Sequence, residues 1–191
     1  MSNTTESLRQ KINSAGDLQS VVRTMKALAA SSIGQYEKSV RSLGDYYRTV
    51  ELGLSVCFRA AGSSALMTGE TKRRDAAAIG AVVFGSDQGL VGQFNDVVTD
   101  HALKALASLT DKPQIWAVGE RVHARLKDGG VPPVGLFTVP NSVKAITPLV
   151  GQILVEHEKH HGRVEVTELY LFYNRPTIGA AYEPVSQRLL P

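Results

Sequence analysis

The chain has 191 residues, of which 43% are hydrophobic and 20% are charged, and its formal net charge is +3. This length supports one well-buried core, and so small a charge excludes the dense basic stripe of a nucleic-acid-binding surface. The single cysteine, Cys57, excludes an intrachain disulfide framework and fits a reducing compartment. The sequence shows no secretory leader and no run of about 18 apolar residues, so we expect no direct membrane insertion.

The first third of the chain, from about Thr5 to Arg59, has the apolar period of a coiled-coil helix. Apolar or small residues recur every three or four positions with a mean step of about 3.5 residues. Residues 1–59 also hold eight Lys and Arg against five Asp and Glu, so they carry the whole net charge. We therefore predict an N-terminal coiled-coil shaft helix over residues 1–59. Its apolar line, called the seam below, consists of Leu8, Ile12, Ala15, Leu18, Val22, Met25, Ala29, Ile33, Tyr36, Val40, Leu43, Tyr47, Val50, Leu54 and Cys57.

Glycines interrupt this helical pattern at Gly16, Gly34, Gly44 and Gly53. Each costs about 1 kcal/mol relative to alanine in a helix, so we expect a bent or locally loosened shaft. Residues 60–75 mix Gly, Ser and Thr with a short basic run and are predicted to be a linker.

From residue 76 onward, apolar strands alternate with helical stretches. Ala76–Phe84 is a near-continuous apolar run, typical of a central strand that is buried on both faces. The alternation predicts a Rossmann-like three-layer α/β domain over 76–191, with a mostly parallel sheet of about five strands and a final pair compatible with a hairpin. The predicted strands are 76–84, 114–118, 134–138, 164–173 and 178–187, with a turn at 174–176; the predicted helices are 96–109, 120–127 and 142–160, the last capped by Ser142.

The turn Gly85–Asn95 lies between the first strand and a helix, where many nucleotide sites are found. It contains neither G-x-G-x-x-G nor a Walker lysine, and an ordinary β-to-α turn uses glycine for the same steric reason. The spacing therefore disfavours a nucleotide site, and no cofactor is predicted.

The run His157–His161 satisfies the letters of the zinc motif H-E-x-x-H. It falls in the last turn of a predicted helix, where the helix dipole and solvent exposure explain histidines equally well. We expect exposed histidines and no metal site. Cys57 lies on the seam as a small buried apolar residue, and no serine has an evident base, so the residues favour a structural or mechanical protein over an enzyme.

Three segments together resemble the γ subunit of F-type ATP synthases. They are Val22–Ser31, with a basic residue, Met and an Ala-Ala-Ser run; Gly85–Asn95, which is similar to the family's Ser-Asp-Arg-Gly-Leu-Cys-Gly turn; and Leu169–Arg175 with the later Glu183–Val185 and Leu189–Pro191. Their order and spacing hold across nearly the whole chain.

The resemblance implies a non-catalytic central-stalk rotor subunit. In this family an antiparallel helix pair stands inside the ring of α and β ATPase subunits, and the α/β domain lies beside the ε subunit and the membrane c-ring. The complex would lie at the cytoplasmic face of a bacterial inner membrane. The resemblance also implies contacts with the α/β ring at Arg23, Met25, Lys26, Ser86, Asp87 and Gln88.

Two departures from the family pattern matter. Gln88 replaces the usual arginine of the Ser-Asp-Arg-Gly turn, and a neutral amide forms a weaker contact than an ion pair. The family also continues past the Leu-Leu-Pro segment into a long C-terminal helix, whereas this sequence ends at Pro191. We therefore expect the uncovered shaft to pair with a second copy or to fold back. Two alternatives stay open: a flavodoxin-like nucleotide-binding domain with a regulatory helix, and an unrelated coiled-coil adaptor.

Overall fold

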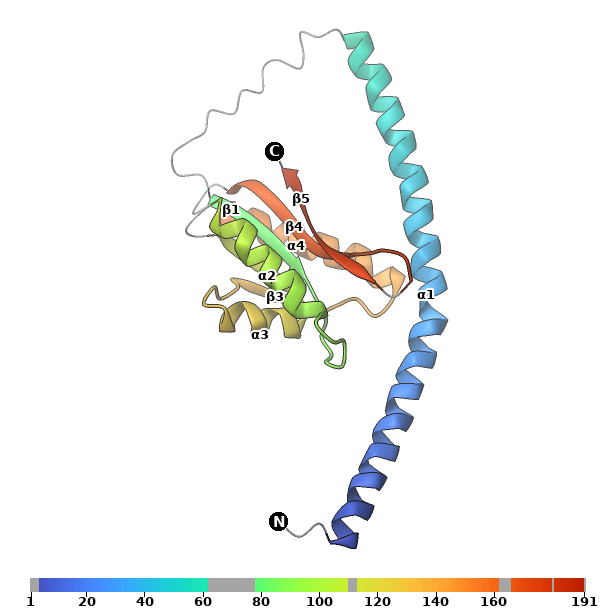
Figure 1. Ribbon diagram of the computed structural model, residues 1–191. Coiled ribbons are helices and arrows are strands. Elements are labelled where there is room, and N and C mark those ends of the chain that lie inside the picture. Colours follow the sequence, from blue (N-terminus) through green and yellow to red (C-terminus); the bar gives the residue numbers. More distant parts are fainter. Residues whose placement is uncertain (1–3, 62–77, 110–112, 162–165, 180, 191) are drawn as a thin grey trace. The chain divides into compact units, whose positions relative to one another are not determined.

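The computed structural model describes residues 4–61, 78–109, 113–161, 166–179 and 181–190 (Figure 1). Contacts divide the chain into two compact units, Met1–Glu70 and Thr71–Pro191, which are described separately below. Most of the segment 60–75, which was predicted to be a linker, lies outside the described residues.

The first unit is one helix, α1, which runs from Thr5 to Ala61 as the apolar period predicts. Its first turn begins with a hydrogen bond from the Leu8 amide to the carbonyl oxygen of Thr4, at 3.1 Å. The helix curves along its length, as expected (Figure 1), but its glycines do not break it. A Cβ added at any of the four helix glycines would meet nothing within 4 Å apart from the neighbouring backbone of α1 itself, so no described side chain of this unit requires glycine there.

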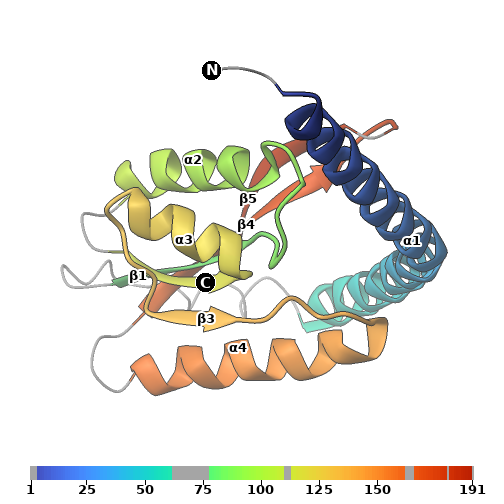
Figure 2. The ribbon, with the colours of Figure 1, turned by 90° about the horizontal axis from the view of Figure 1, so that it is seen from below.

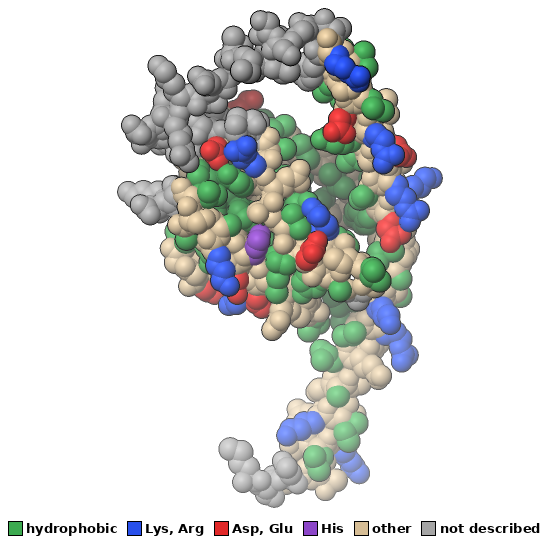
Figure 3. All heavy atoms as spheres, turned by 45° about the horizontal axis from the view of Figure 1, so that its top comes forward, with side chains coloured by type: hydrophobic (Ala, Val, Ile, Leu, Met, Phe, Trp, Pro, Cys, Tyr) green, Lys and Arg blue, Asp and Glu red, His purple; other side chains and the backbone are tan. Residues whose placement is uncertain are grey.

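The seam of α1 is uncovered. Most of its large side chains are exposed, Val40 and Leu43 among them, whereas Met25 and Tyr36 are partly buried. Hydrophobic side chains show at the surface along the helix (Figure 3). Cys57 is exposed, so its predicted burial is wrong. The reason is that burial on a coiled-coil seam is supplied by a partner helix and not by the helix itself.

The second unit is a five-stranded sheet with the strand order β3-β2-β1-β4-β5. The first four strands pair in parallel, and β4 and β5 form an antiparallel hairpin. This confirms the predicted number of strands and the mostly parallel pairing. The strands are β1 (Ala78–Phe84), β2 (Gln114–Val118), β3 (Gly135–Phe137), β4 (Val166–Pro176) and β5 (Tyr182–Leu190); the helices are α2 (Phe94–Ala107), α3 (Glu120–Asp128), the 3-10 turn η2 (Val143–Ala145) and α4 (Ile146–His161).

Three local predictions differ from the structure. β4 continues through 174–176, where a turn was expected, and the chain reverses at Thr177, whose amide donates to the carbonyl oxygen of Ala181 at 2.9 Å. β5 therefore begins at Tyr182 and not at residue 178. Ser142 precedes a 3-10 turn and makes no side-chain cap, so α4 begins only at Ile146.

Helices cover both faces of the sheet. Helices α2 and α3 lie on one face and α4 lies on the other (Figure 2). Alternate residues of β1 serve the two resulting cores: Ala81 and Val83 pack with Phe172, and Val82 packs with Trp116. Burying a large side chain such as Phe172 stabilises the fold by about 2–3 kcal/mol. The predicted burial of the first strand on both faces is therefore confirmed.

Candidate contact loop

The loop from Gly85 to Gln93 connects β1 to α2 and extends past the end of the sheet in Figure 1. Asp87 anchors this loop through both carboxylate oxygens. Its Oδ1 accepts the amide of Glu120, the first residue of α3, at 3.0 Å. Its Oδ2 accepts the amide of Val139, just after β3, at 2.9 Å. One side chain therefore ties together the segments that follow three neighbouring strands.

Ser86 and Asn95 close the base of the loop. The Ser86 amide donates to Asn95 Oδ1 at 2.9 Å, and Asn95 Nδ2 donates to Ser86 Oγ at 2.9 Å. The Ser86 hydroxyl then donates to the carbonyl oxygen of Gln88 at 2.8 Å. Asn174 of β4 donates to the carbonyl oxygen of Phe94 at 2.8 Å, which fixes the start of α2. Asn95 is buried, so its two bonds with Ser86 are partly shielded from competing water, whereas the bond from Ser86 to Gln88 is exposed.

Glycine is required where α3 approaches this base. Gly119 precedes α3 with φ +113°, and a Cβ there would lie 2.9 Å from the backbone atoms of Ser86. The amide of Arg121 donates to the carbonyl oxygen of Ser86 at 2.9 Å across the same contact. The backbone of the loop and the start of α3 are thus packed against each other.

The tip of the loop has a different character from its base. Gln88 is exposed, and Leu90 is 72% exposed with φ +62°. Sequence reasoning did not single out Leu90, because a leucine between Gly89 and Gly92 gives no signal of a left-handed conformation. It also missed Arg121, which lies beside Gly89 only in the folded chain.

The other predicted contact residues lie on α1. Arg23 and Lys26 are exposed and Met25 is partly exposed. They occupy neighbouring positions on the helix, with Met25 on the seam. The structure therefore brings Ser86, Asp87 and Gln88 together in one loop and places the remaining three residues on a separate unit.

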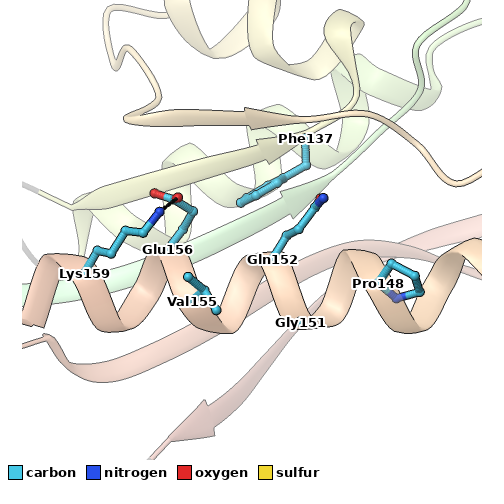
Figure 4. Close-up of a pocket in the computed structure, with 7 residues that line it drawn as sticks. All are labelled: Phe137, Pro148, Gly151, Gln152, Val155, Glu156 and Lys159. Carbon is cyan, nitrogen blue, oxygen red and sulfur yellow. Dashed lines mark hydrogen bonds and ion pairs between the residues drawn. The ribbon is translucent and has the colours of Figure 1, made fainter.

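A groove of about 650 Å³ lies between β3 and α4 (Figure 4). Phe137 of β3 points toward α4, and Gln152 and Val155 line the groove from the helix. Its two charged lining residues form an ion pair with each other, with 2.6 Å between Lys159 Nζ and Glu156 Oε1. The groove offers an apolar surface and no free charge with which to orient a small polar substrate.

The first histidine of the H-E-x-x-H match is buried, although exposure was expected. His157 is only 5% exposed, with its ring centroid 6.2 Å from that of Trp116, so its predicted exposure is wrong. The cause is helix geometry, since His157 falls on the face of α4 that packs on the sheet. The His161 side chain lies outside the described residues. Among the residues that the structure describes, no group of three or more His, Cys, Asp or Glu side chains is placed to hold a metal.

The β4–β5 hairpin carries a tyrosine with a perturbed pKa. The hydroxyl of Tyr170 donates to Glu168 Oε2 at 2.7 Å. This hydrogen bond is the main cause that raises the pKa of Tyr170 above its ordinary value of 10.0, and partial burial and the charge of Glu168 add to it. The pKa of Arg175 is also raised, chiefly by a side-chain hydrogen bond with Tyr173. Both sites lie away from the contact loop and suit sheet stability more than chemistry.

The fold defines a class of protein: a long N-terminal helix with a coiled-coil apolar period, joined to an α/β domain with a mostly parallel five-stranded sheet. No helix in the described part of the chain is long and apolar enough to cross a membrane. A family model described as ATP synthase matches residues 4–191, and the chain belongs to that family.

Curated relatives extend this result. The chain is 24% identical over 192 residues to the ATP synthase gamma chain of Dechloromonas aromatica, covering 96% of this chain and 64% of that protein. It is 27% identical over 192 residues to the ATP synthase gamma chain of Clavibacter sepedonicus, covering 95% of this chain and 62% of the relative. The chain thus spans slightly less than two thirds of the length of these relatives.

A solved structure shares the fold. The rotor of the Euglena gracilis mitochondrial ATP synthase includes a chain that matches with a TM-score of 0.55 at 18% identity. The match covers 96% of this chain and 61% of the other. The match therefore shows a shared fold over almost the whole of this chain.

Proposed function

We propose that the chain is the central-stalk rotor subunit of an F-type ATP synthase. It would couple rotation driven by ion translocation to ATP synthesis or hydrolysis on the surrounding ring of α and β subunits. The observation that carries this proposal is the match to ATP synthase gamma chains over almost the whole chain. The uncovered seam of α1 supports it, because a shaft needs a partner helix along its length.

In this proposal the subunit is not itself catalytic; it transmits torque while the ring performs the chemistry. Its partners are the α and β subunits, the ε subunit and the c-ring, at the cytoplasmic face of a bacterial inner membrane. The α/β unit is a Rossmann-like domain. Support for this last point is the strand order β3-β2-β1-β4-β5, which follows the first five strands of the classic doubly wound order.

Six residues are proposed to serve contact with the ring: Arg23, Met25, Lys26, Ser86, Asp87 and Gln88. Their roles differ. Ser86 and Asp87 hold the loop through internal hydrogen bonds, whereas Gln88 is exposed and faces the partner. On the shaft, Arg23 and Lys26 are exposed cations suited to polar or acidic groups of the ring.

Co-purification tests the proposal. The full-length gene product carrying residues 1–191 is expressed with α and β ATPase subunits, and a stable complex is expected. Gln88→Arg should tighten the complex by restoring a charged contact, and Arg23→Gln with Lys26→Gln should loosen it. Failure of the unmodified protein to associate would refute the rotor assignment. A thermal shift induced by a nucleotide or flavin would instead support the flavodoxin-like alternative.

A further inference from the structure

Helix α2 begins without a side-chain cap of its own. Gln93 occupies the N-cap position with φ −88° and ψ 13°, and its side chain makes no capping hydrogen bond. A helix start is normally stabilised by a side-chain oxygen that accepts one of the first amides. The amide of Phe94 instead donates to the carbonyl oxygen of Val91 at 3.3 Å, a long bond. The first turn of α2 therefore depends on contacts from outside the helix.

The β4–β5 hairpin supplies two of these contacts, and both are made to Phe94. Asn174 of β4 donates from Nδ2 to the carbonyl oxygen of Phe94 at 2.8 Å. Tyr182 of β5 meets the Phe94 ring edge to face, with 5.2 Å between the ring centroids and 68° between the ring planes. These three residues are called the latch below. Each strand of the hairpin thus holds the same residue, one by its backbone and the other by its ring.

The closed latch is only weakly favoured. Asn174 Oδ1 is buried and accepts no hydrogen bond from another described residue. A buried acceptor without a partner is costly, and this cost offsets much of the gain from the bond that Nδ2 makes. Turning the Asn174 side chain toward water would satisfy Oδ1 and would break the bond to Phe94 in the same movement. A small displacement of the hairpin is therefore enough to open the latch.

We propose that the latch is a conformational device through which the β4–β5 hairpin controls the first turn of α2. While the hairpin is docked, Asn174 and Tyr182 hold Phe94, and the turn is helical. When the hairpin moves away, both contacts are lost together, and the uncapped turn frays from Phe94 to Val97. The latch lies wholly within the α/β unit, so it works in the same way whichever partner displaces the hairpin.

Amide hydrogen exchange in the 191-residue protein tests the latch. One reporter is the amide of Val97 at the start of α2, which donates to the carbonyl oxygen of Gln93 at 2.9 Å. The other is the amide of Leu109, beyond the opposite end of the same helix, which donates to the carbonyl oxygen of Leu106 at 2.9 Å. Asn174→Ala should raise the exchange rate of Val97 about fivefold and leave that of Leu109 unchanged.

Two further variants separate the parts of the latch. Asn174→Asp keeps the shape of the side chain but places a carboxylate against the carbonyl oxygen of Phe94, so it should raise Val97 exchange about tenfold. Tyr182→Ala removes the ring contact from the other strand and should raise it about threefold. If Tyr182→Ala leaves Val97 exchange unchanged, the hairpin does not act through both strands and the proposal is wrong.

Gln187→Ala is the matched control on the same hairpin. Gln187 Oε1 accepts the Tyr173 hydroxyl at 3.3 Å on the face of the hairpin opposite to Asn174, so its loss does not touch the latch. This variant should leave Val97 exchange unchanged, and a rise equal to that of Asn174→Ala would overturn the latch. An equal rise at Val97 and Leu109 in the Asn174→Ala protein would also overturn it, because the whole helix would then be loosened. So would unchanged Val97 exchange in both Asn174 variants.

Discussion

Asp87 and Val139 are 52 residues apart in the chain and are joined by a 2.9 Å hydrogen bond from the Val139 amide to the carboxylate. The second oxygen of the same carboxylate accepts the first amide of α3. A residue predicted from the family pattern to contact a partner is thus an internal brace of the α/β unit. The loop owes its shape to this brace, so changes at Asp87 should affect folding as well as contact.

Replacing Asp87 by alanine should destabilise the α/β unit. Two amides would lose a charged acceptor, and the Val139 amide is partly buried, so we expect a loss of about 2 kcal/mol in the free energy of unfolding. Asp87→Asn keeps one acceptor oxygen and should recover part of this loss. Urea denaturation followed by tryptophan fluorescence measures both, since Trp116 lies in the core of this unit.

Asp100→Ala is the control for this pair of variants. Asp100 is an exposed residue of α2 outside the loop. Its replacement should change the free energy of unfolding by less than about 0.5 kcal/mol. Equal stability of the Asp87→Ala and Asp100→Ala proteins would show that the two amides do not need the carboxylate.

Gly119→Ala should be one of the more damaging single substitutions in the α/β unit. The residue has φ +113°, and an added Cβ would lie 2.9 Å from the Ser86 backbone, so strain and collision should together cost about 3 kcal/mol. Gly130→Ala separates the two effects, because Gly130 has φ +81° with open space around it and should cost only about 1 kcal/mol. Thermal unfolding compares them, and equal melting temperatures would rule out the collision.

Much of the fold is predictable from sequence because it depends on apolar period. The 3.5-residue step gives α1, and the apolar run before Gly85 gives a central strand that is buried on both faces. Turn residues are weaker evidence. Asn174–Pro176 looks like a turn, yet the pairing of β4 with β5 carries the strand through it, because an edge hairpin tolerates proline. Burial of a side chain against another element also cannot be predicted from sequence. His157 is buried because α4 packs against Trp116 of the sheet.

The candidate site is predictable only in part. A Gly-rich turn between a strand and a helix marks Ser86–Gln88 as a loop worth attention. The sequence cannot show that the Asp87 carboxylate accepts hydrogen bonds from backbone amides that lie 33 and 52 residues further along the chain. Nor can it show the left-handed backbone of Leu90, which leucine does not signal. The position of Arg121 beside Gly89 is hidden as well, because it depends on how α3 packs against the loop.

The stability of the hairpin should fall at alkaline pH because of Tyr170. Its pKa is raised in the folded state above 10.0, chiefly by the hydrogen bond to Glu168. The protonated hydroxyl is therefore favoured by folding, and this contribution is fully present below pH 10.0. It is lost as the pH rises through the higher folded pKa. Urea denaturation at neutral pH and above the ordinary tyrosine pKa measures the loss.

Tyr170→Phe should be less stable than the unmodified protein at neutral pH, with a smaller further loss in alkali. Glu168→Gln should bring the titration of Tyr170 down toward its ordinary pKa, followed by ultraviolet difference absorption. Tyr46→Phe, at an exposed tyrosine of α1, should leave the pH dependence of the α/β unit unchanged. If the Tyr170→Phe protein loses as much stability at alkaline pH as the unmodified protein does, the loss comes from another titrating group.

The exposed seam of α1 should drive self-association when no partner helix is supplied. Leu43 and Leu28 are equally exposed, at 66%, but only Leu43 lies on the seam. Burying a leucine in a helix pair stabilises it by about 1.5–3 kcal/mol. Leu43→Gln should therefore raise the dissociation constant for self-association at least about tenfold.

Leu28→Gln is the matched control, because it removes an equally exposed leucine from the same helix. Leu28 does not lie on the seam, so this substitution should leave the dissociation constant unchanged. Light scattering over a concentration series measures all three proteins. If the unmodified protein stays monomeric at every concentration, the seam does not pair with a second copy. Equal weakening by the two substitutions would show that association depends on general hydrophobicity and not on the 3.5-residue period, because only a heptad-based contact distinguishes two leucines of equal exposure.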